Sequence, residues 1–312
     1  MDEVNRKFGM GWLRDYPDFR DHHLEHDGVP PALQRAGQKR SVKKMLREIG
    51  VTAPSAPAAP PAVDLRPWCA PIEDQGALGS CTANAAVGLV EYFEKRAIGH
   101  YLDGSRLFVY KATRDLLHWV GDTGAFLRTT MKALVFFGVP PEEFLPYVIA
   151  DFDKEPSAFC YAFGQSYQPI NYYRLDPPGT SRALLLDRIK ALAAAGLPSM
   201  FGFTVYNSYP QAANNGKFPF PVPGERIAGG HAMDVVGYDD SVKIKNTNPG
   251  GVETTGALMI RNSWGAGWGN SGYGWLPYEY VLRGLAVDFW SILKNEWVDS
   301  GAFGASAMAK AA

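Results

Sequence analysis

The sequence predicts an α+β protein in which a mainly helical half is followed by a half of antiparallel strands. Apolar residues recur with a helical period between about residue 81 and residue 137. After about residue 198, runs of β-branched and aromatic residues are separated by Gly, Asn and Pro. Because these strands do not alternate with helices, we expect two packed halves with a cleft between them.

Composition indicates an ordinary globular protein of two domains. The chain has 312 residues, of which 46% are hydrophobic and 20% charged, with a net charge of −1. This balance argues against a nucleic-acid partner or a charged membrane surface. No apolar run approaches the ~18 residues needed to span a membrane, and no Sec signal peptide is visible. The location stays open between the cytoplasm and export by a non-Sec route.

Helical periodicity is clearest in the first half of the chain. Between residues 81 and 97, five apolar positions share one helical face and Gly99 ends the pattern. Ser105 is a suitable N-cap for a second helix that ends near residue 117. A third helix is expected over residues 125–137, closed by Gly138.

The second half begins with one more helix, over residues 182–195. Short strands follow it, and their even spacing predicts an antiparallel sheet or barrel. The expected strands are residues 200–205, 232–238, 257–261, 274–277 and 287–293.

The first 62 residues differ from the rest. Residues 11–21 mix charges with aromatics and show no period, and a basic run over residues 35–47 is interpreted as one solvated helix face. A Pro/Ala-rich spacer over residues 53–62 should be extended and semi-rigid. This N-terminal extension either folds back over the cleft and blocks it or simply packs on the body of the protein. The other expected divisions are a helical domain over residues 63–165, a β domain over residues 166–298 and a tail over residues 299–312.

Three cysteines are too few for a disulfide framework. At most one bridge can form, which indicates a reducing compartment or a cysteine kept for chemistry. Cys81 follows Gly79-Ser80 and opens a predicted helix. The positive end of a helix dipole favours a thiolate, which is the nucleophilic form of the side chain.

His231 is the histidine best placed to act as a base. It lies at the entry to an apolar strand, directly after Gly230, and glycine there allows another backbone to approach closely. Further along, the side chain of Asn262 could fix the tautomer of a histidine ring, and Trp264 could cover that hydrogen bond. Gln75 precedes Cys81 by six residues, and its amide could donate to an oxyanion beside the nucleophile.

Taken in order, Gln75, Cys81, His231 and Asn262 resemble the papain family of cysteine peptidases, over about residues 63–298. Cys81 and His231 are 150 residues apart, within the ~130–150 of papain-type enzymes. The matching motifs are Asp74-Gln75-Gly76, Gly79-Ser80-Cys81, His231-Ala232, Val235-Val236-Gly237-Tyr238 and Asn262-Ser263-Trp264-Gly265-Ala266-Gly267-Trp268-Gly269-Asn270-Ser271-Gly272-Tyr273.

The resemblance implies a papain-like two-domain fold, with a helical left domain and a right domain formed by an antiparallel sheet or barrel. It also implies roles for the four residues. Cys81 would be the nucleophile, His231 the base and then the acid, Asn262 the residue that orients the imidazole, and Gln75 the oxyanion donor. Substrate contacts are expected from the residues of two loops and the tryptophan that follows Asn262: Thr123, Gly124, Gly230, Ala232 and Trp264.

Some residues depart from the family pattern. Thr82 follows the nucleophile where an aromatic residue is usual, and Leu78 stands where many secreted members carry a disulfide cysteine. These features are similar to a bacterial branch of the family. The long helical propeptide of secreted members has no match in residues 1–62, so removal of the extension is an open question. Cys69 and Cys160 could form a bridge or remain two inert thiols.

The predicted activity is endopeptidase cleavage of peptides or proteins through a thioester, with a Cys81 thiolate paired with a His231 imidazolium. No cofactor or metal is implied, since the sequence has neither a Cys-x₂-Cys pair nor a His-Glu-x-x-His motif. Two alternatives are an acyltransferase or peptide ligase on the same fold, and a binding module that has lost catalysis.

Overall fold

The computed structural model describes residues 8–29, 31, 34, 39–51, 59–164, 170–304 and 307. Its principal helices are α2 (Val42–Glu48), α3 (Cys81–Ile98), α4 (Arg106–Leu116), α5 (Leu127–Phe137), α6 (Ala158–Gly164), α7 (Arg182–Ala194), α8 (Tyr278–Leu282) and α9 (Asn295–Asp299). The strands are β1 (Trp12–Leu13), β2 (Ala62–Asp64), β3 (Ala125–Phe126), β4 (Asn171–Arg174), β5 (Ser199–Tyr206), β6 (Ile227–Lys245), β7 (Glu253–Arg261), β8 (Tyr273–Pro277) and β9 (Ala286–Leu293).

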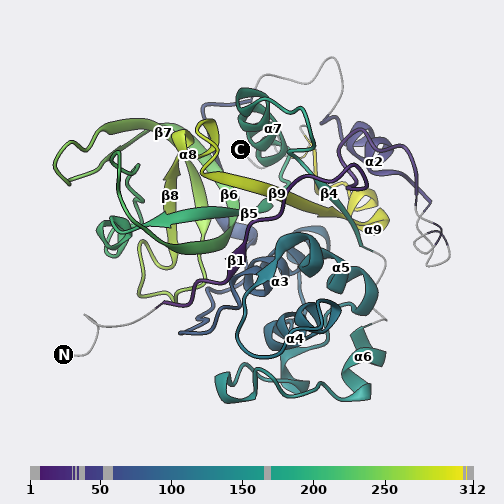
Figure 1. Ribbon diagram of the computed structural model, residues 1–312. Helices are drawn as coiled ribbons and strands as arrows, with labels where there is room; N and C mark the ends of the chain where they lie inside the picture. Colours follow the sequence, from purple (N-terminus) through teal and green to yellow (C-terminus); the bar gives the residue numbers. More distant parts are fainter. Residues whose placement is uncertain are drawn as a thin grey trace.

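Helices α3 to α6 and the large sheet occupy two different parts of the molecule, as the sequence predicts, while α7 and α8 pack on the sheet (Figure 1). Helices α3, α4, α5 and α6 lie together on one side. The other side holds a seven-stranded antiparallel sheet of order β4-β9-β5-β6-β7-β8, with β2 paired to β6. The fold is therefore α+β with two domains.

The α3 helix joins the two parts. Nearly all of its residues are buried, and it packs against β6 as well as against α4 and α5. Gly88 makes this close packing possible, because a Cβ there would lie 2.3 Å from a guanidinium nitrogen of Arg261 on β7. The first turn of α3 is consequently fixed at the boundary between helices and sheet.

Local signals in the sequence account for the ends of the main helices. Ser105 caps α4 by accepting a hydrogen bond from the backbone N–H of Phe108. Gly99 ends α3 in a left-handed conformation with φ +84°. The α5 helix begins two residues later than expected, since Ala125 and Phe126 form β3 instead.

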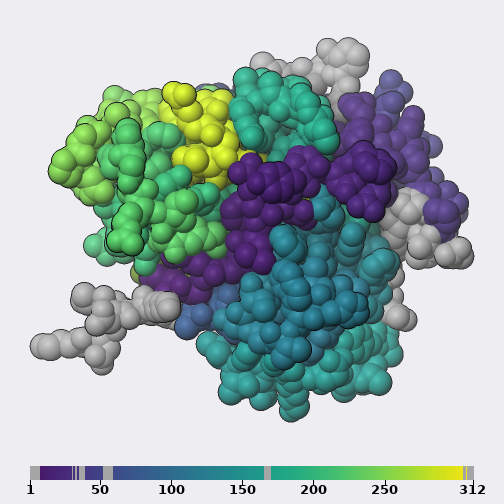
Figure 2. Space-filling model, in the orientation of Figure 1, coloured from purple at the N-terminus to yellow at the C-terminus, as the bar shows by residue number. Residues whose placement is uncertain are grey.

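The N-terminal part of the chain is built into the fold. Residues from 8 onward cross the front of the molecule between the β-rich and helical halves, where Figure 2 shows them in purple. The basic run contains α2, whose Val42, Met45 and Leu46 are buried while Lys44 and Arg47 are exposed. Arg35 and most of the Pro/Ala spacer lie outside the described residues.

The expected C-terminal tail also packs on the body of the protein where it is described. Phe303 is buried, with its ring centroid 5.3 Å from that of Phe93 on α3. Within the described residues, no helix has the length and apolar character required to cross a membrane.

Candidate active site

Cys81 is the first residue of α3 and is completely buried. The backbone N–H of Gly11 donates a hydrogen bond to its Sγ over 3.4 Å. The backbone amide of Ala232 also lowers the pKa of the Cys81 thiol, so it lies near the sulfur. Since Ala232 directly follows His231, the sulfur of the helical part lies next to strand β6 of the sheet.

His231 lies on β6, held by the residues that the sequence singles out. Its Nε2 is 2.8 Å from Oδ1 of Asn262, an oxygen that can only accept, so Nε2 carries the hydrogen. The Trp264 ring stacks on the imidazole at a centroid distance of 4.5 Å. Among the described residues, the buried Nδ1 has no hydrogen-bond partner. The ring therefore keeps one unprotonated nitrogen.

The sheet register explains why Asn262 meets His231. Arg261, the last residue of β7, pairs with Asp234 on β6. The chain then continues as Asn262 and Ser263 along β6 in the direction of His231. The Oδ1 of Asn262 accepts a second hydrogen bond from the backbone N–H of Ser263 over 2.8 Å, which fixes the amide.

Gln75 is tied to the same loop. Its backbone N–H donates to the carbonyl of Ser263 over 2.8 Å, and its Oε1 accepts from the Ser263 hydroxyl over 2.5 Å. The Nε2 donates to the carbonyls of Leu78, at 2.8 Å, and Gly9, at 3.1 Å. The amide donor is thus held just before the loop that leads to Cys81.

Two of the predicted substrate contacts, Thr123 and Gly124, lie in the loop that faces the Gly79 backbone. Asp122 accepts hydrogen bonds from the Gly79 N–H at 2.9 Å and from the Tyr110 hydroxyl at 2.5 Å, and so joins the two loops. The Gly124 N–H donates to the Tyr110 hydroxyl, whereas the exposed Thr123 hydroxyl donates to its neighbour's carbonyl. Thr123 and Gly124 line a groove of about 480 Å³, which Gly230 also lines.

Residues 8–13, which we call the covering segment, lie in the cleft. The Gly9 carbonyl accepts from Gln75 Nε2, and the Gly11 N–H contacts Cys81 Sγ. The ring of Phe8 stacks on Trp264 at 4.6 Å. Cβ atoms at positions 9 and 11 would meet the carbonyl oxygens of Leu78 at 2.0 Å and Gly79 at 1.9 Å. Only glycine fits at both positions.

The covering segment ends in strand β1, which pairs in parallel with β3. The backbone N–H of Ala125 donates to the Gly11 carbonyl over 2.8 Å. The donor to this segment is thus the backbone N–H of Ala125, which directly follows the Gly124 selected by the sequence analysis. The sequence analysis gave blocking of the cleft by the 62-residue extension as one of two alternatives but did not single out residues 8–13, although the Gly9-x-Gly11 spacing, typical of close backbone approach, could have indicated them.

Burial changes the acid–base state expected for Cys81 and His231. Loss of water around the sulfur raises the pKa of the Cys81 thiol to about 11, despite hydrogen bonds from backbone amides that lower it. Burial also lowers the pKa of His231 to about 4, partly opposed by Asn262. The expected thiolate–imidazolium pair is therefore disfavoured while the cleft is covered, because a low-dielectric site favours the neutral forms.

The three cysteines are all unbridged thiols in the described part of the chain. Of the two alternatives for Cys69 and Cys160, the structure supports separate thiols. Burial raises the pKa of Cys69 to about 11, which makes it a weak nucleophile.

Comparison with known proteins agrees with this geometry. The model of the papain family cysteine protease matches residues 59–281. The crystal structure of xylellain, a cysteine protease from Xylella fastidiosa, is 32% identical with a TM-score of 0.69, covering 92% of this chain and 97% of that one. An uncharacterized peptidase C1-like protein of Acanthamoeba polyphaga mimivirus is 30% identical over 93% of this chain and 87% of its own length.

A more distant structure shares the fold. Digestive procathepsin L 3 of Tenebrio molitor is 20% identical with a TM-score of 0.59, covering 78% of this chain and 72% of that one. The family match spans both the α3 region and the sheet through β8, and therefore every residue of the Gln75, Cys81, His231 and Asn262 set. The chain belongs to the papain family of cysteine proteases.

Proposed function

We propose that Cys81 and His231 hydrolyse peptide bonds through a thioester, with Asn262 orienting the imidazole and Gln75 stabilising the oxyanion. One observation carries the proposal. His231 is held through Nε2 by Asn262 at 2.8 Å, and its buried Nδ1 has no partner among the described residues. The backbone amide of the next residue, Ala232, lies near enough to the sulfur of Cys81 to lower the pKa of that thiol. This arrangement provides a nucleophile, an oriented base and an adjacent amide donor.

The proposed reaction begins when the Cys81 proton moves to His231 Nδ1 and the sulfur attacks the carbonyl carbon of a bound peptide. Negative charge develops on the carbonyl oxygen, where Nε2 of Gln75 and the backbone N–H of Cys81 donate hydrogen bonds. His231 then protonates the amine that leaves as the C–N bond breaks. A water molecule gives a proton to His231 and attacks the thioester, which releases the acid and restores the thiol.

We also propose that the covering segment inhibits the enzyme. It uses the groups that the reaction needs, since Gly9 occupies the Gln75 donor and Gly11 contacts the sulfur. Burial under this segment shifts the pKa values of Cys81 and His231 away from the reactive ionic forms. Proteolysis would then require displacement or removal of residues 8–13.

Covalent labelling tests the catalytic proposal. A Gly11→Ala chain, in which a Cβ displaces the covering segment, is treated with an epoxide inhibitor of cysteine peptidases and examined by intact-mass spectrometry. We expect one adduct on Cys81 and none in the matched Gly11→Ala, Cys81→Ala chain. Labelling confined to Cys69 or Cys160 contradicts the proposal.

Product analysis separates hydrolysis from acyl transfer. Fluorogenic peptides are cleaved in the presence of an added amine, and the products are identified by mass. We expect free acids to predominate. Predominant amide products instead support the ligase alternative, and binding without turnover or labelling supports the non-catalytic module.

A further inference from the structure

A chain of hydrogen bonds, which we call the loop link, joins the loop before Cys81 to the loop that leads into β3. The backbone N–H of Gly79 donates to both carboxylate oxygens of Asp122, at 2.9 and 3.1 Å. The Tyr110 hydroxyl donates to Oδ1 of Asp122 at 2.5 Å and accepts from the backbone N–H of Gly124 at 3.0 Å. Asp122 is exposed, but its partners are buried. Breaking the loop link would therefore leave buried polar groups unpaired, which is unfavourable.

Helix α4 holds the loop link in place. Tyr110 and Arg114 lie four residues apart on this helix, and therefore on one face. The buried Arg114 guanidinium lies 4.3 Å from the centre of the Tyr110 ring and donates to the carbonyl of Gly121 at 2.7 Å. It also pairs with Asp153 at 2.6 Å. The loop of residues 121–124 is thus attached to α4 at both of its ends.

The other end of the loop link reaches the nucleophile through Gly79. A Cβ at this position would lie 2.8 Å from Oδ1 of Asp122, so only glycine allows so close an approach. Cys81 follows two residues later as the first residue of α3. The position of the Gly79 backbone therefore helps to set the position of the Cys81 sulfur.

Gly11 of the covering segment spans the distance that the loop link sets. Its N–H meets Cys81 Sγ at 3.4 Å, and its carbonyl accepts from the N–H of Ala125 at 2.8 Å. The backbone of one residue therefore reaches from the sulfur to the first amide of β3. A substrate residue that takes the place of Gly11 would be held at Ala125, with its adjacent backbone beside the sulfur. Any change in the separation of the two loops would move that backbone away from the sulfur.

We infer that Tyr110 and Asp122 are positioning residues, which set the spacing between the Cys81 sulfur and a substrate backbone held by Ala125. The inference rests on the proposed function, because it concerns the reaction in the same cleft. Neither side chain touches the reacting atoms. A misplacement of about 1 Å can nevertheless slow a reaction about 10²-fold, because the reacting atoms must meet in the correct geometry. The loop link would thus control the reaction with peptides without altering the thiol itself.

A matched pair of alkylating reagents tests this inference. Chloroacetone and acetyl-Ala-Ala-chloromethyl ketone carry the same reactive group, but only the second has a peptide backbone that can pair with Ala125. In both reactions the sulfur of Cys81 bonds to the methylene carbon and chloride leaves, so no hydrolysis is required. Rates at Cys81 are measured by peptide mapping in the full-length Gly11→Ala chain, in which the covering segment is displaced.

Tyr110→Phe in this background removes only the hydroxyl of the loop link. We expect the peptide reagent to react with Cys81 at least about tenfold more slowly, and chloroacetone to react at an unchanged rate. The loss should appear in the limiting rate and not in the half-saturating concentration, since the peptide still binds but its reactive carbon is displaced. The kcat for a fluorogenic peptide should fall by a similar factor.

Tyr92→Phe is the matched control. The buried Tyr92 hydroxyl lies further along α3, where it donates to the carbonyl of Gly196 at 3.0 Å and accepts from Arg96 at 2.8 Å. It therefore loses as many hydrogen bonds as Tyr110→Phe does, but none of them belongs to the loop link. We expect both reagents to react at unchanged rates.

Asp122 provides a second pair of variants. Asp122→Asn keeps an oxygen for the Gly79 N–H and gains an amide that can donate to the Tyr110 oxygen, whereas Asp122→Ala removes both contacts. Asp122→Asn should therefore retain more of the peptide reagent's rate. Equal loss in the two variants overturns the inference.

Three other results would overturn it. Equal slowing of both reagents in Tyr110→Phe places the defect in the thiol itself. An unchanged rate for the peptide reagent shows that the spacing does not depend on the loop link. The same loss in Tyr92→Phe indicates a general effect of removing a buried hydroxyl. The expected pattern in a chain that cleaves no peptide supports the inference and contradicts the proposed hydrolysis.

Discussion

The side-chain amide of Gln75 donates to the carbonyl oxygen of Gly9 at 3.1 Å. A donor suited to a developing oxyanion is therefore already occupied by the protein's own backbone. The same segment places the Gly11 N–H on Cys81 Sγ. Inhibition by this segment would act on the oxyanion donor and on the nucleophile together.

Gly11→Ala should activate the full-length protein. The added Cβ would lie 1.9 Å from the Gly79 carbonyl oxygen, so the covering segment cannot remain in place. We expect at least about a tenfold rise in kcat/KM on a small fluorogenic peptide if displacement costs the closed state roughly 1.4 kcal/mol. Gly28→Ala is the control, because a Cβ at Gly28 would lie nearest the His26 ring, at 3.1 Å, and far from the cleft residues. Equal activity of the two variants contradicts inhibition by residues 8–13.

Gln75→Ala should slow turnover when measured in the Gly11→Ala background. Loss of one oxyanion donor removes about 3 kcal/mol of transition-state stabilisation, or about 10²-fold in kcat. Gln211→Ala is a matched control, since that amide donates to Asn246 and Asn248. A change in KM with no change in kcat argues against the oxyanion role.

The pH dependence of thiol alkylation should separate covered and uncovered chains. In the covered chain burial raises the pKa of Cys81 to about 11, so the thiolate forms only in strongly alkaline solution. Displacing the segment admits water and should lower the pKa of Cys81 and raise that of His231 above about 4. The rate at which iodoacetamide alkylates Cys81 is followed by peptide mapping across a range of pH. This rate should begin to rise at a lower pH in Gly11→Ala than in the parent chain. Superimposable profiles for Cys81 contradict this prediction.

The stability of the covered state should in turn depend on pH through the Cys81 thiol. A raised pKa in the closed state means that closing favours the protonated thiol. Closing is therefore strongest below the pKa of the uncovered thiol and weakens as pH rises through about 11. Peptidase activity of the parent chain relative to Gly11→Ala, measured across the alkaline range in which both remain folded, reports this change.

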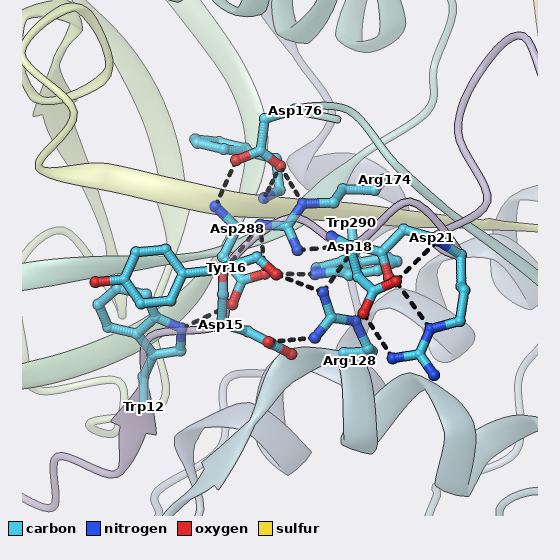
Figure 3. Close-up of polar contacts among 12 residues, drawn as sticks. Trp12, Asp15, Tyr16, Asp18, Asp21, Arg128, Arg174, Asp176, Asp288 and Trp290 are labelled. Atoms are coloured by element: carbon cyan, nitrogen blue, oxygen red, sulfur yellow. Dashed lines mark hydrogen bonds and ion pairs between the residues drawn. The ribbon is translucent and has the colours of Figure 1, made fainter. Parts of the chain in front are cut away.

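Arg128→Ala should weaken the attachment of residues 15–21 of the N-terminal extension to the body of the protein. The Arg128 guanidinium donates to Asp15, to Asp21 and to the Tyr16 carbonyl, all of them in the extension (Figure 3). Because Arg128 and Asp21 are mostly buried, we expect a loss on the order of 2 kcal/mol in unfolding free energy and a gain in peptidase activity. Chemical denaturation and the fluorogenic assay measure the two effects.

Arg20→Ala provides the comparison for that variant. Arg20 pairs with Asp18 in the same extension, but its side chain is 76% exposed. Solvent screening leaves such a pair with little effect on stability. If both arginine variants behave alike, the buried ion pairs do not hold the extension in place.

The residues proposed for catalysis could be selected from the sequence because each has a distinctive type in a recognisable local setting. Cys81 opens a helix, His231 follows two glycines on a strand, and Asn262 begins a motif rich in Trp and Gly. Helix α3 and strands β5 and β9 were predicted for a related reason, since strong periodicity or long apolar runs decide local structure.

The covering segment could not be predicted in the same way. Strand β1 has only two residues and pairs with β3, far along the chain, so its structure depends on tertiary contacts. Asp288 stands inside an apolar run that indicates a buried strand, and nothing in that run reveals the Trp12 indole beside it. The Arg128 ion pairs likewise join residues more than 100 positions apart.

The hydrogen bond from Gly11 to the sulfur has a consequence for turnover. Here the thiol meets an amide hydrogen rather than an electrophilic carbon, and an amide nitrogen cannot form a thioester. If residues 8–13 inhibit the enzyme as proposed, they would therefore remain uncleaved in this pose, and the same molecule would become inactive again whenever they returned to the cleft.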